Sequence, residues 1–406
     1  MGNERPSDSQ GNRPDGEDDI RVRLFAPEDV DGGDARRDFL SVPRSLALRG
    51  LSTCERHRAD TMQVLSDSLP DKGVTPESTL IGLAVAWAGH DPSARVALFR
   101  HAGDPSAGYL GLFESDGRQD AANAMFAEIE ALAAESGMVR LVGPVDGTIW
   151  ERYRYKVSGF EEKPYLGEPT NPERYPAIWE AAGFSACDLW HADMIPQVAA
   201  AGPDKMSSRL QRAVDLGYSF RSLSFRSFRT DIEAIHRLVS NLYTELPGYT
   251  PVSFDDFLVR SWPLRMAVDA RGTILATDTS GEVVGFMIAL PDYGSVRGRG
   301  IVRALGMARM RLRPSRYAIL HMGVARGHEG LGGAMAALMR RRLAEARVTA
   351  VAAFVRDGRP TGAYLGVLSA RRACGYALYE KEILPVGSEG PESGPEGAEN
   401  SEVVRG

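Results

Sequence analysis

The stretch over 317–343 constrains the fold of this chain more than any other. Its first part, 317–324, is an apolar run rich in Ile, Leu, Met and Val, which predicts a buried strand. Its last part, 333–343, repeats Ala, Leu and Met at helical spacing, and the sequence GHEGLGG lies between the two. A glycine-rich turn into a helix leaves backbone N–H groups without partners at the helix N-terminus, where the helix dipole also favours an anion. The stretch therefore predicts a site for a phosphate or pyrophosphate.

Two common nucleotide-binding templates do not fit this turn. No Lys-Ser or Lys-Thr pair follows the glycines, as a Walker-type loop for nucleoside triphosphates requires. No acidic residue stands where a dinucleotide-binding unit places its ribose partner. An ordinary strand-to-helix connection without a ligand is the alternative.

Length and composition indicate a globular protein with two domains. The 406 residues exceed the usual single domain, and the net charge of -6 gives no reason to expect nucleic acid as a partner. The three cysteines are odd in number and widely spaced, which favours a reducing, cytoplasmic environment without disulfides. No run of about 18 apolar residues occurs, so we expect no membrane span, and no His/Cys cluster has metal-ligand spacing.

The chain divides at a short segment rich in Ala, Pro and Gly. We expect an N-terminal domain over 20–195, a linker over 196–204 and a C-terminal domain over 205–386. The segments 1–19 and 387–406 are rich in Gly, Pro, Ser and acidic residues and should be disordered tails.

Strands and helices alternate in both halves, which predicts a mixed α/β fold. In the first half we expect strands over 80–87, 94–99, 109–113, 139–142 and 188–194, and helices over 119–136 and 171–183. In the second half we expect strands over 218–223, 273–278, 283–289, 317–324, 349–355 and 376–383, and helices over 230–245, 254–262, 333–343 and 361–373.

The strand, turn and helix over 317–343 resemble the acyl-CoA signature of the GNAT acyltransferase superfamily, Gln/Arg-x-x-Gly-x-Gly/Ala. Two registers fit: Gly327, Gly330 and Gly332, or Glu329, Gly332 and Ala334. Both lack the leading Gln or Arg, and Arg326 stands nearby as a displaced cation. The element order after 205 is that of a GNAT domain, and the first half follows it from its hairpin onward without the glycine signature.

The whole chain, over roughly 22–382, is similar to a set of two-domain bacterial GNAT-type proteins. The resemblance rests on GYLGLFES, ESGMVRLVGPVDG, SGFEEKP, NPERYPAIWEAAGFSACDLW, GYTPVSFDDF, VVGFMIALPDYG, RDGRP and YALYEK, in that order. It implies two tandem GNAT-fold domains, of which the degenerate N-terminal one does not bind CoA and shapes the acceptor site.

The resemblance also implies where an acyl donor binds, either acetyl-CoA or a longer acyl-CoA. Its pantetheine arm would pair with the strand over 319–324, and an N–H such as that of Met322 or Val324 would hold the developing oxyanion. Its pyrophosphate would meet the N–H groups from Gly330 to Ala334. The implied cofactor-binding residues are Met322, Gly323, Val324, Arg326, Gly327, Gly330, Leu331, Gly332, Gly333 and Ala334.

An amine acceptor needs a base, and three residues are candidates. Asp292 follows an apolar strand and should lie near the mouth of the cleft, while Glu245 ends a predicted helix where substrate enters. His321 lies within the cofactor strand and takes a proton near neutral pH. Structural roles are the alternative for each: a turn carboxylate, a solvated carboxylate and an interior histidine, respectively.

A general acid for the leaving thiolate is less well marked. The tyrosine common in the family before the last strand is replaced by Arg371, so the usual acid is absent from its expected position. Tyr364, Tyr376 and Tyr379 are the candidates, with ordinary packing as the alternative.

Two groups of side chains suggest partners. Seven aromatic residues of the first half either pack in the core or wall a substrate cleft: Trp150, Tyr153, Tyr155, Tyr165, Tyr175, Trp179 and Trp190. Eight arginines over 293–328 either bind the ribose phosphate, dock an acidic carrier protein, rest on an anionic membrane surface or form a solvated insertion: Arg297, Arg299, Arg303, Arg309, Arg311, Arg313, Arg316 and Arg326.

The sequence thus predicts an N-acyltransferase that transfers an acyl group from acyl-CoA to an amine of a small molecule or peptide in a ternary complex. One alternative uses acyl-phosphopantetheine on an acyl carrier protein to make an acylated peptide or other natural product. A tRNA-dependent transferase is disfavoured by the low basicity, and a non-catalytic GNAT pair acting as a scaffold is the remaining alternative. Assembly into an oligomer is compatible with each.

Overall fold

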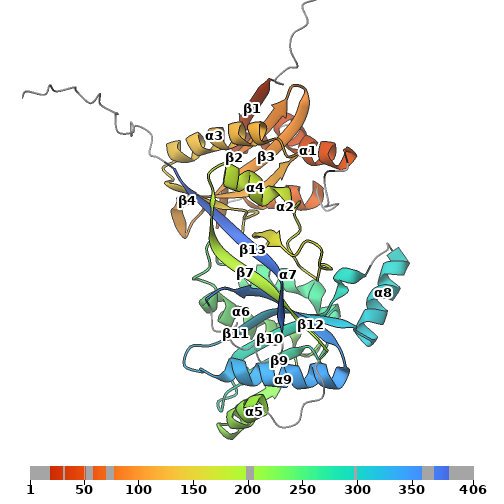
Figure 1. Ribbon diagram of the computed structural model, residues 1–406. Helices are drawn as coiled ribbons and strands as arrows, with labels where there is room; N and C mark the ends of the chain where they lie inside the picture. Colours follow the sequence, from red (N-terminus) through yellow and green to blue (C-terminus); the bar gives the residue numbers. More distant parts are fainter. Residues whose placement is uncertain are drawn as a thin grey trace, which may run out of the picture.

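The computed structural model describes residues 19–30, 33–49, 51, 58–69, 77–197, 205–296, 300–358 and 370–383. Its strands join in one continuous sheet that runs the length of the molecule, with helices on both faces (Figure 1). The strand order is β1-β2-β3-β4-β5-β13-β7-β12-β11-β10-β9-β8, with β6 paired to β13 outside this path.

The N-terminal half contains the first seven strands in chain order. They are β1 (Ile20–Phe25), β2 (Ser78–Ala88), β3 (Asp91–His101), β4 (Asp104–Ser115), β5 (Arg140–Gly143), β6 (Tyr155–Ser158) and β7 (Ser185–Ile195). The helices are α1 (Gly33–Leu48), α2 (Arg58–Asp67), α3 (Gln119–Glu135) and α4 (Arg174–Ala181). The predicted strands and helices of this half are confirmed within a few residues, whereas β1, α1, α2 and β6 were not predicted.

The C-terminal half begins at α5 (Lys205–Asp215). Its strands are β8 (Ser219–Arg221), β9 (Thr273–Thr277), β10 (Val283–Pro291), β11 (Arg316–Val324), β12 (Thr349–Arg356) and β13 (Arg371–Glu382). Its other helices are α6 (Phe228–Leu242), α7 (Phe254–Ser261), the 3-10 helix η3 (Trp262–Met266), α8 (Gly300–Leu312) and α9 (Leu331–Ala346). The strand and helix over 317–343, which the glycine turn joins, are confirmed as β11 and α9.

The predicted helix over 361–373 is wrong at its end. Arg371 and Arg372 belong to β13, where they pair with Met194 and Asp193 of β7, so pairing with a distant strand overrides the local sequence. Residues 361–369 of that predicted helix, including Tyr364, lie outside the described residues, as do both predicted tails apart from Asp19.

The two halves exchange strands at the middle of the sheet. The last strand of the chain, β13, lies between β5 and β7, and β7 in turn pairs with β12 (Figure 1). Tyr376, Leu378 and Tyr379 of β13 are almost fully buried, and Leu378 and Tyr379 complete the apolar cores of the N-terminal half. Neither half therefore has a complete sheet of its own.

Within the described part of the chain, no helix is long and apolar enough to cross a membrane, and no group of three or more His, Cys, Asp or Glu side chains is placed to hold a metal ion.

Candidate acyl-donor and acceptor cleft

The sheet opens where β11 and β12 diverge. The two strands pair in parallel only from Arg316 to Ile319, opposite Thr349 to Ala352, while β10 stays paired to β11 as far as Val324. Leu320 is an extra residue in β11, because Ile288 pairs with His321 and Ala289 with Ile319. Such a bulge bends a strand and re-aims its side chains, so β11 turns away from β12 at this point.

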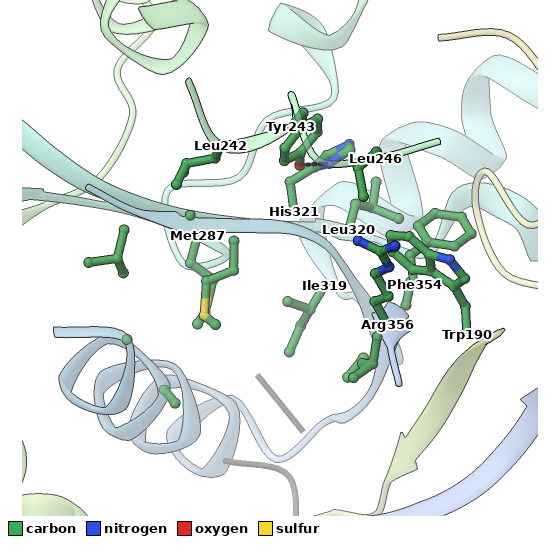
Figure 2. A pocket seen from close by; sticks show the side chains of 18 of the residues that line it. Trp190, Leu242, Tyr243, Leu246, Met287, Ile319, Leu320, His321, Phe354 and Arg356 are labelled. Atoms are coloured by element: carbon green, nitrogen blue, oxygen red, sulfur yellow. Dashed lines mark hydrogen bonds between the residues drawn. The ribbon is translucent and has the colours of Figure 1, made fainter. Parts of the chain in front are cut away.

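A cavity of about 730 Å³ lies at this opening (Figure 2). It reaches both faces of the sheet: α9 and Ile319 line one side, and the end of α6 with His321 lines the other. The N-terminal half contributes a third wall through the loop over 149–154 and Trp190 of β7. The cavity therefore joins the glycine turn, the strand opening and both halves of the protein.

The free edge of β11 presents backbone groups to this cavity. Ala325 N donates to Val284 O of β10, and antiparallel pairing alternates along the strand. The N–H groups of Met322 and Val324 therefore point to the edge that β12 has left. Gly323 lies between them, where a Cβ atom would meet the Phe286 ring at 2.6 Å and Leu242 at 2.7 Å. Glycine is required for this close packing.

Helix α9 begins at the cavity. Gly330 has a left-handed backbone with φ of 91° and offers no side-chain cap, and both Gly330 and Gly332 line the cavity. The N–H groups of Gly333 and Ala334 both donate to Gly330 O, at 3.1 and 3.3 Å. Such a glycine-led helix N-terminus suits a pyrophosphate.

The predicted cofactor residues divide into two groups in the structure. Met322, Gly323, Val324, Arg326, Gly330 and Gly332 line the cavity, whereas Gly327, Leu331, Gly333 and Ala334 do not. Glu329 also lines it, and its carboxylate accepts a bond from Gly327 N at 3.2 Å. Gly330 and Gly332 thus stay the predicted contacts for a phosphate.

His321 and Tyr243 lie next to each other on one side of the cavity (Figure 2). The Tyr243 hydroxyl lies 3.1 Å from His321 Nδ1. His321 is exposed to the cavity, and desolvation by the surrounding protein together with the positive charge of Arg154 lowers the pKa of His321 to about 4. Desolvation raises the pKa of Tyr243 to about 12. At neutral pH the pair is therefore a neutral imidazole next to a protonated phenol.

Trp150 of the N-terminal half fixes the position of Tyr243. Its ring stacks on that of Tyr243 with centroids 6.2 Å apart, and its Nε1 donates to Thr250 O at 3.0 Å. Tyr243 was not predicted from sequence, because nothing in the sequence around it marks a tyrosine at the end of α6 as facing a strand 78 residues later.

Of the predicted bases, His321 and Glu245 line the cavity and Asp292 does not. Asp292 is 1% exposed, its Oδ2 accepts a bond from Arg316 Nε at 2.6 Å, and its Oδ1 accepts one from Leu166 N at 2.9 Å. The expectation that Asp292 lies at the mouth of the cleft is therefore wrong, and the residue has a structural role. Glu245 forms an exposed ion pair with Arg326 at 3.5 Å.

The predicted acids within the described part of the chain lie elsewhere. The Tyr379 hydroxyl donates to Glu180 Oε1 at 3.0 Å inside the N-terminal half, and the Tyr376 hydroxyl donates to Glu168 Oε1 at 2.6 Å. Neither tyrosine lines the cavity. Both tyrosines are buried on β13, and the strand exchange places β13 between β5 and β7, away from β11.

The aromatic residues of the first half have two roles. Tyr155, Tyr175 and Trp179 pack in its core. Trp150, Tyr153 and Trp190 line the cavity, as the second of the two sequence interpretations expected. Arg154 lies among them and was not predicted.

The corresponding opening of the N-terminal half is filled by its own chain. Parallel pairing of β4 with β5 ends at Tyr109 and Val142, as it does between β11 and β12. Here, however, Asp146 Oδ1 accepts a bond from Leu112 N at 2.6 Å, and Val145 N donates to Leu110 O at 2.7 Å. The loop that occupies this place continues into the wall of the other half's cavity.

The described elements form two halves of mixed α/β class, as the sequence predicted. Two halves share one strand plan, and the second carries the bulged strand and glycine-led helix. No protein-family model matches the sequence, and no curated protein matches it.

Several solved structures have a similar fold. A tandem GNAT protein from the clavulanic acid biosynthesis pathway matches at 13% identity and a TM-score of 0.46, with 90% of this chain and 99% of that chain covered. A GCN5-related N-acetyltransferase from Sphaerobacter thermophilus matches at 14% identity and a TM-score of 0.41, covering 90% and 96%. The C-terminal domain of a putative lysylphosphatidylglycerol synthetase from Agrobacterium fabrum matches at 9% identity and a TM-score of 0.36, covering 86% and 92%.

Proposed function

We propose that the chain is an N-acyltransferase that transfers an acyl group from acyl-CoA to an amine. The observation that carries this proposal is the single cavity that joins the free edge of β11, the N-terminus of α9 and the His321–Tyr243 pair. Backbone N–H groups at the free edge suit an extended pantetheine arm, and the helix N-terminus suits its pyrophosphate. In the N-terminal half, Asp146 occupies the matching edge, so we expect one donor per chain.

The chemical step needs a proton to pass from the amine to the leaving thiolate. With His321 in the tautomer that carries its proton on Nδ1, Nε2 accepts the proton of the attacking amine. Nδ1 then gives its proton to the Tyr243 oxygen as the Tyr243 hydroxyl gives its own to the thiolate sulfur. The N–H of Met322 or Val324 holds the carbonyl oxygen as it becomes negative. The products are the N-acyl amine and free CoA, and no proton is gained or lost.

Donor binding is tested by a carboxylate placed at the start of α9. Gly332→Glu should weaken binding of acetyl-CoA and octanoyl-CoA by at least about 100-fold in isothermal titration, because like charges repel at a site built for an anion. The wild-type protein should bind one donor per chain, and the preferred acyl length then reports the depth of the pocket.

Gly103→Glu is the matched control for charge and residue type. Gly103 lies in the turn between β3 and β4, and a Cβ added there meets nothing within 4 Å. It should bind both thioesters as the wild type does. Equal binding by the two variants, or no binding by the wild type, would rule out the proposed donor site.

A carrier-protein donor is a second candidate because of helix α8. This helix stands out from the body of the protein (Figure 1) and exposes apolar and basic side chains together. Ile301, Val302 and Leu305 are 79%, 66% and 66% exposed, and Arg303 and Arg309 are exposed on the same helix. An acidic carrier protein would complement this surface.

Charge reversal distinguishes the two donors. Arg303→Glu combined with Arg309→Glu should leave acyl transfer from acetyl-CoA unchanged, because α8 does not line the cavity. If a carrier protein is the donor, the same variant should lower kcat/KM for an acyl carrier protein by about 10-fold or more, with a weaker salt dependence. Unchanged kinetics with the carrier-bound donor would exclude α8 as the docking surface.

A further inference from the structure

Arg154 is a buried cation on the wall of the cavity. It follows Tyr153 with a left-handed backbone, φ 72°, which is strained for a residue other than glycine, and it is 8% exposed. Its guanidinium carbon lies 4.0 Å from the ring centroid of Trp190, 4.6 Å from that of Tyr153 and 4.7 Å from that of Phe354. Aromatic faces thus surround the guanidinium, and all four residues line the cavity.

Three polar atoms of this box are not used by the protein. Within the described ranges, Arg154 Nε and Nη1 and the Tyr153 hydroxyl are buried and have no hydrogen-bond partner. None of the ion pairs formed by residues of the described ranges involves Arg154. The nearby carboxylate of Asp188 is already held by Arg356 Nε at 2.7 Å and by Trp190 Nε1 at 2.8 Å. Burying a cation without a partner costs several kcal/mol, and each unused donor adds about 1–3 kcal/mol.

Arg95 shows what a structural arginine looks like in the same protein. It is also buried, with its guanidinium 4.5 Å from the Phe39 ring. Unlike Arg154, it uses that group within the protein, since Nη1 donates to Phe39 O at 3.1 Å and Nη2 to Thr61 Oγ1 at 3.5 Å. Arg95 does not line the cavity. Arg95 Nε also has no hydrogen-bond partner within the described ranges, so the difference at Arg154 is that Nη1 is unpaired as well.

We propose that Arg154, with the Tyr153 hydroxyl, binds a carboxylate of the acceptor, so that the acceptor is an amine that also carries a carboxylate, such as an amino acid. The inference rests on the proposed acyltransferase function and names its acceptor class. A single cation in an aromatic box suits a monoanion, and guanidinium is the side-chain group best matched to carboxylate. Tyr153, Arg154 and Trp190 belong to the wall supplied by the N-terminal half and Phe354 belongs to β12, whereas the donor phosphates would lie at the α9 glycines of the same cavity.

The position of the box also relates the carboxylate to catalysis. The charge of Arg154 is one cause of the low pKa of His321. A carboxylate bound to Arg154 offsets that charge, so the imidazole becomes a better base when an acceptor of the right class is in place. Amines without a carboxylate leave the cation unpaired and the base weak.

Matched substrates test the proposal without any variant. Acyl transfer from acetyl-CoA is measured with the proteinogenic amino acids, β-alanine and 4-aminobutyrate, each against its own carboxamide. The amine is attached to the same carbon in both compounds, and in the carboxamide a larger fraction of it is in the reactive free-base form at neutral pH, so amine protonation does not favour the carboxylate form. We expect the carboxylate form of the best substrate to have a kcat/KM about 10- to 100-fold higher. Equal or better use of carboxamides would overturn the proposal.

Variants then assign the preference to Arg154. Arg154→Met should raise KM for the carboxylate form about 10- to 100-fold and leave the carboxamide little changed, whereas Arg154→Lys should retain part of the preference. Arg95→Met, a loss of a buried arginine outside the cavity, should keep the full preference. Succinyl-CoA is compared with acetyl-CoA in the same series. An Arg154-dependent preference for the succinyl donor, in place of the acceptor, would overturn the assignment to the acceptor.

A binding measurement separates this inference from the proposed function. Trp190 stacks on Arg154, so its fluorescence should change when a carboxylate enters the box, and acyl transfer is not required. The wild-type protein, with CoA present, is titrated with the same amino acids and carboxamides. Saturable changes with amino acids that Arg154→Met abolishes would support the inference even if no thioester is turned over. No saturable change with any amino acid would overturn it.

Discussion

Replacing His321 with alanine should lower kcat for acyl transfer about 100- to 1,000-fold, with little change in the affinity for acetyl-CoA. A positioned general base contributes about 10²–10⁴-fold, and His321 is the neutral imidazole of the cavity, 3.1 Å from the Tyr243 hydroxyl. The measurement is single-turnover acyl transfer at saturating donor and acceptor. Tyr243→Phe keeps the ring that packs on Trp150 and should lower the same rate about 10-fold. A His321→Ala rate within threefold of the wild type would exclude His321 as the base.

The pH dependence of the same reaction follows from the lowered pKa of His321. With a pKa of about 4 in the free enzyme, the imidazole is neutral and able to accept a proton throughout pH 5–8. The plot of log(kcat/KM) against pH should therefore show only the slope of the acceptor amine in this range. A second break near 6.5, where an ordinary histidine titrates, would mean that the surrounding protein and Arg154 do not lower the pKa of His321.

Removing β13 by ending the chain at residue 370 should abolish cooperative folding of the N-terminal half as well as of the C-terminal half. The strand pairs with β5 and β7 at once, and it buries Tyr376, Leu378 and Tyr379. Three such side chains contribute about 5–9 kcal/mol, comparable with the 5–15 kcal/mol that stabilises a typical domain. Thermal unfolding followed by circular dichroism should show no transition.

A chain that ends at residue 386 is the control, because it retains every described strand. It should unfold cooperatively at the temperature of the full-length protein. A cooperative transition of the shorter, 370-residue chain would show that the N-terminal half folds without the last strand, contrary to the exchange of strands seen in the sheet.

Local patterns were sufficient to predict most of the elements around the cleft. The apolar run before GHEGLGG and the helical repeat after it are long and continuous, so β11 and α9 could be placed from the sequence. His321 was found for the same reason, since it lies within that strand. The glycine-led helix follows from the turn itself, whereas the open strand edge was implied by the resemblance to GNAT proteins.

Features that depend on contacts distant in sequence could not be predicted in this way. Tyr243 and Arg154 reach the cavity from other elements, and neither has a local pattern that marks it. Asp292 follows a strand as a cleft carboxylate would, yet the pairing of Arg316 draws it into a structural bond. The exchange of β13 depends on competition among strands of both halves. Hydrophobic periodicity and strand propensity do not encode the outcome of that competition.

Hydrogen–deuterium exchange with and without acetyl-CoA tests the donor site most directly. We expect slower exchange at the free edge of β11, over 320–324, and at the start of α9, over 330–332, with β4 and the loop over 144–148 unchanged. Protection of β4 and that loop, or no protection anywhere in the presence of saturating acetyl-CoA, would contradict the assignment of the donor to the C-terminal half.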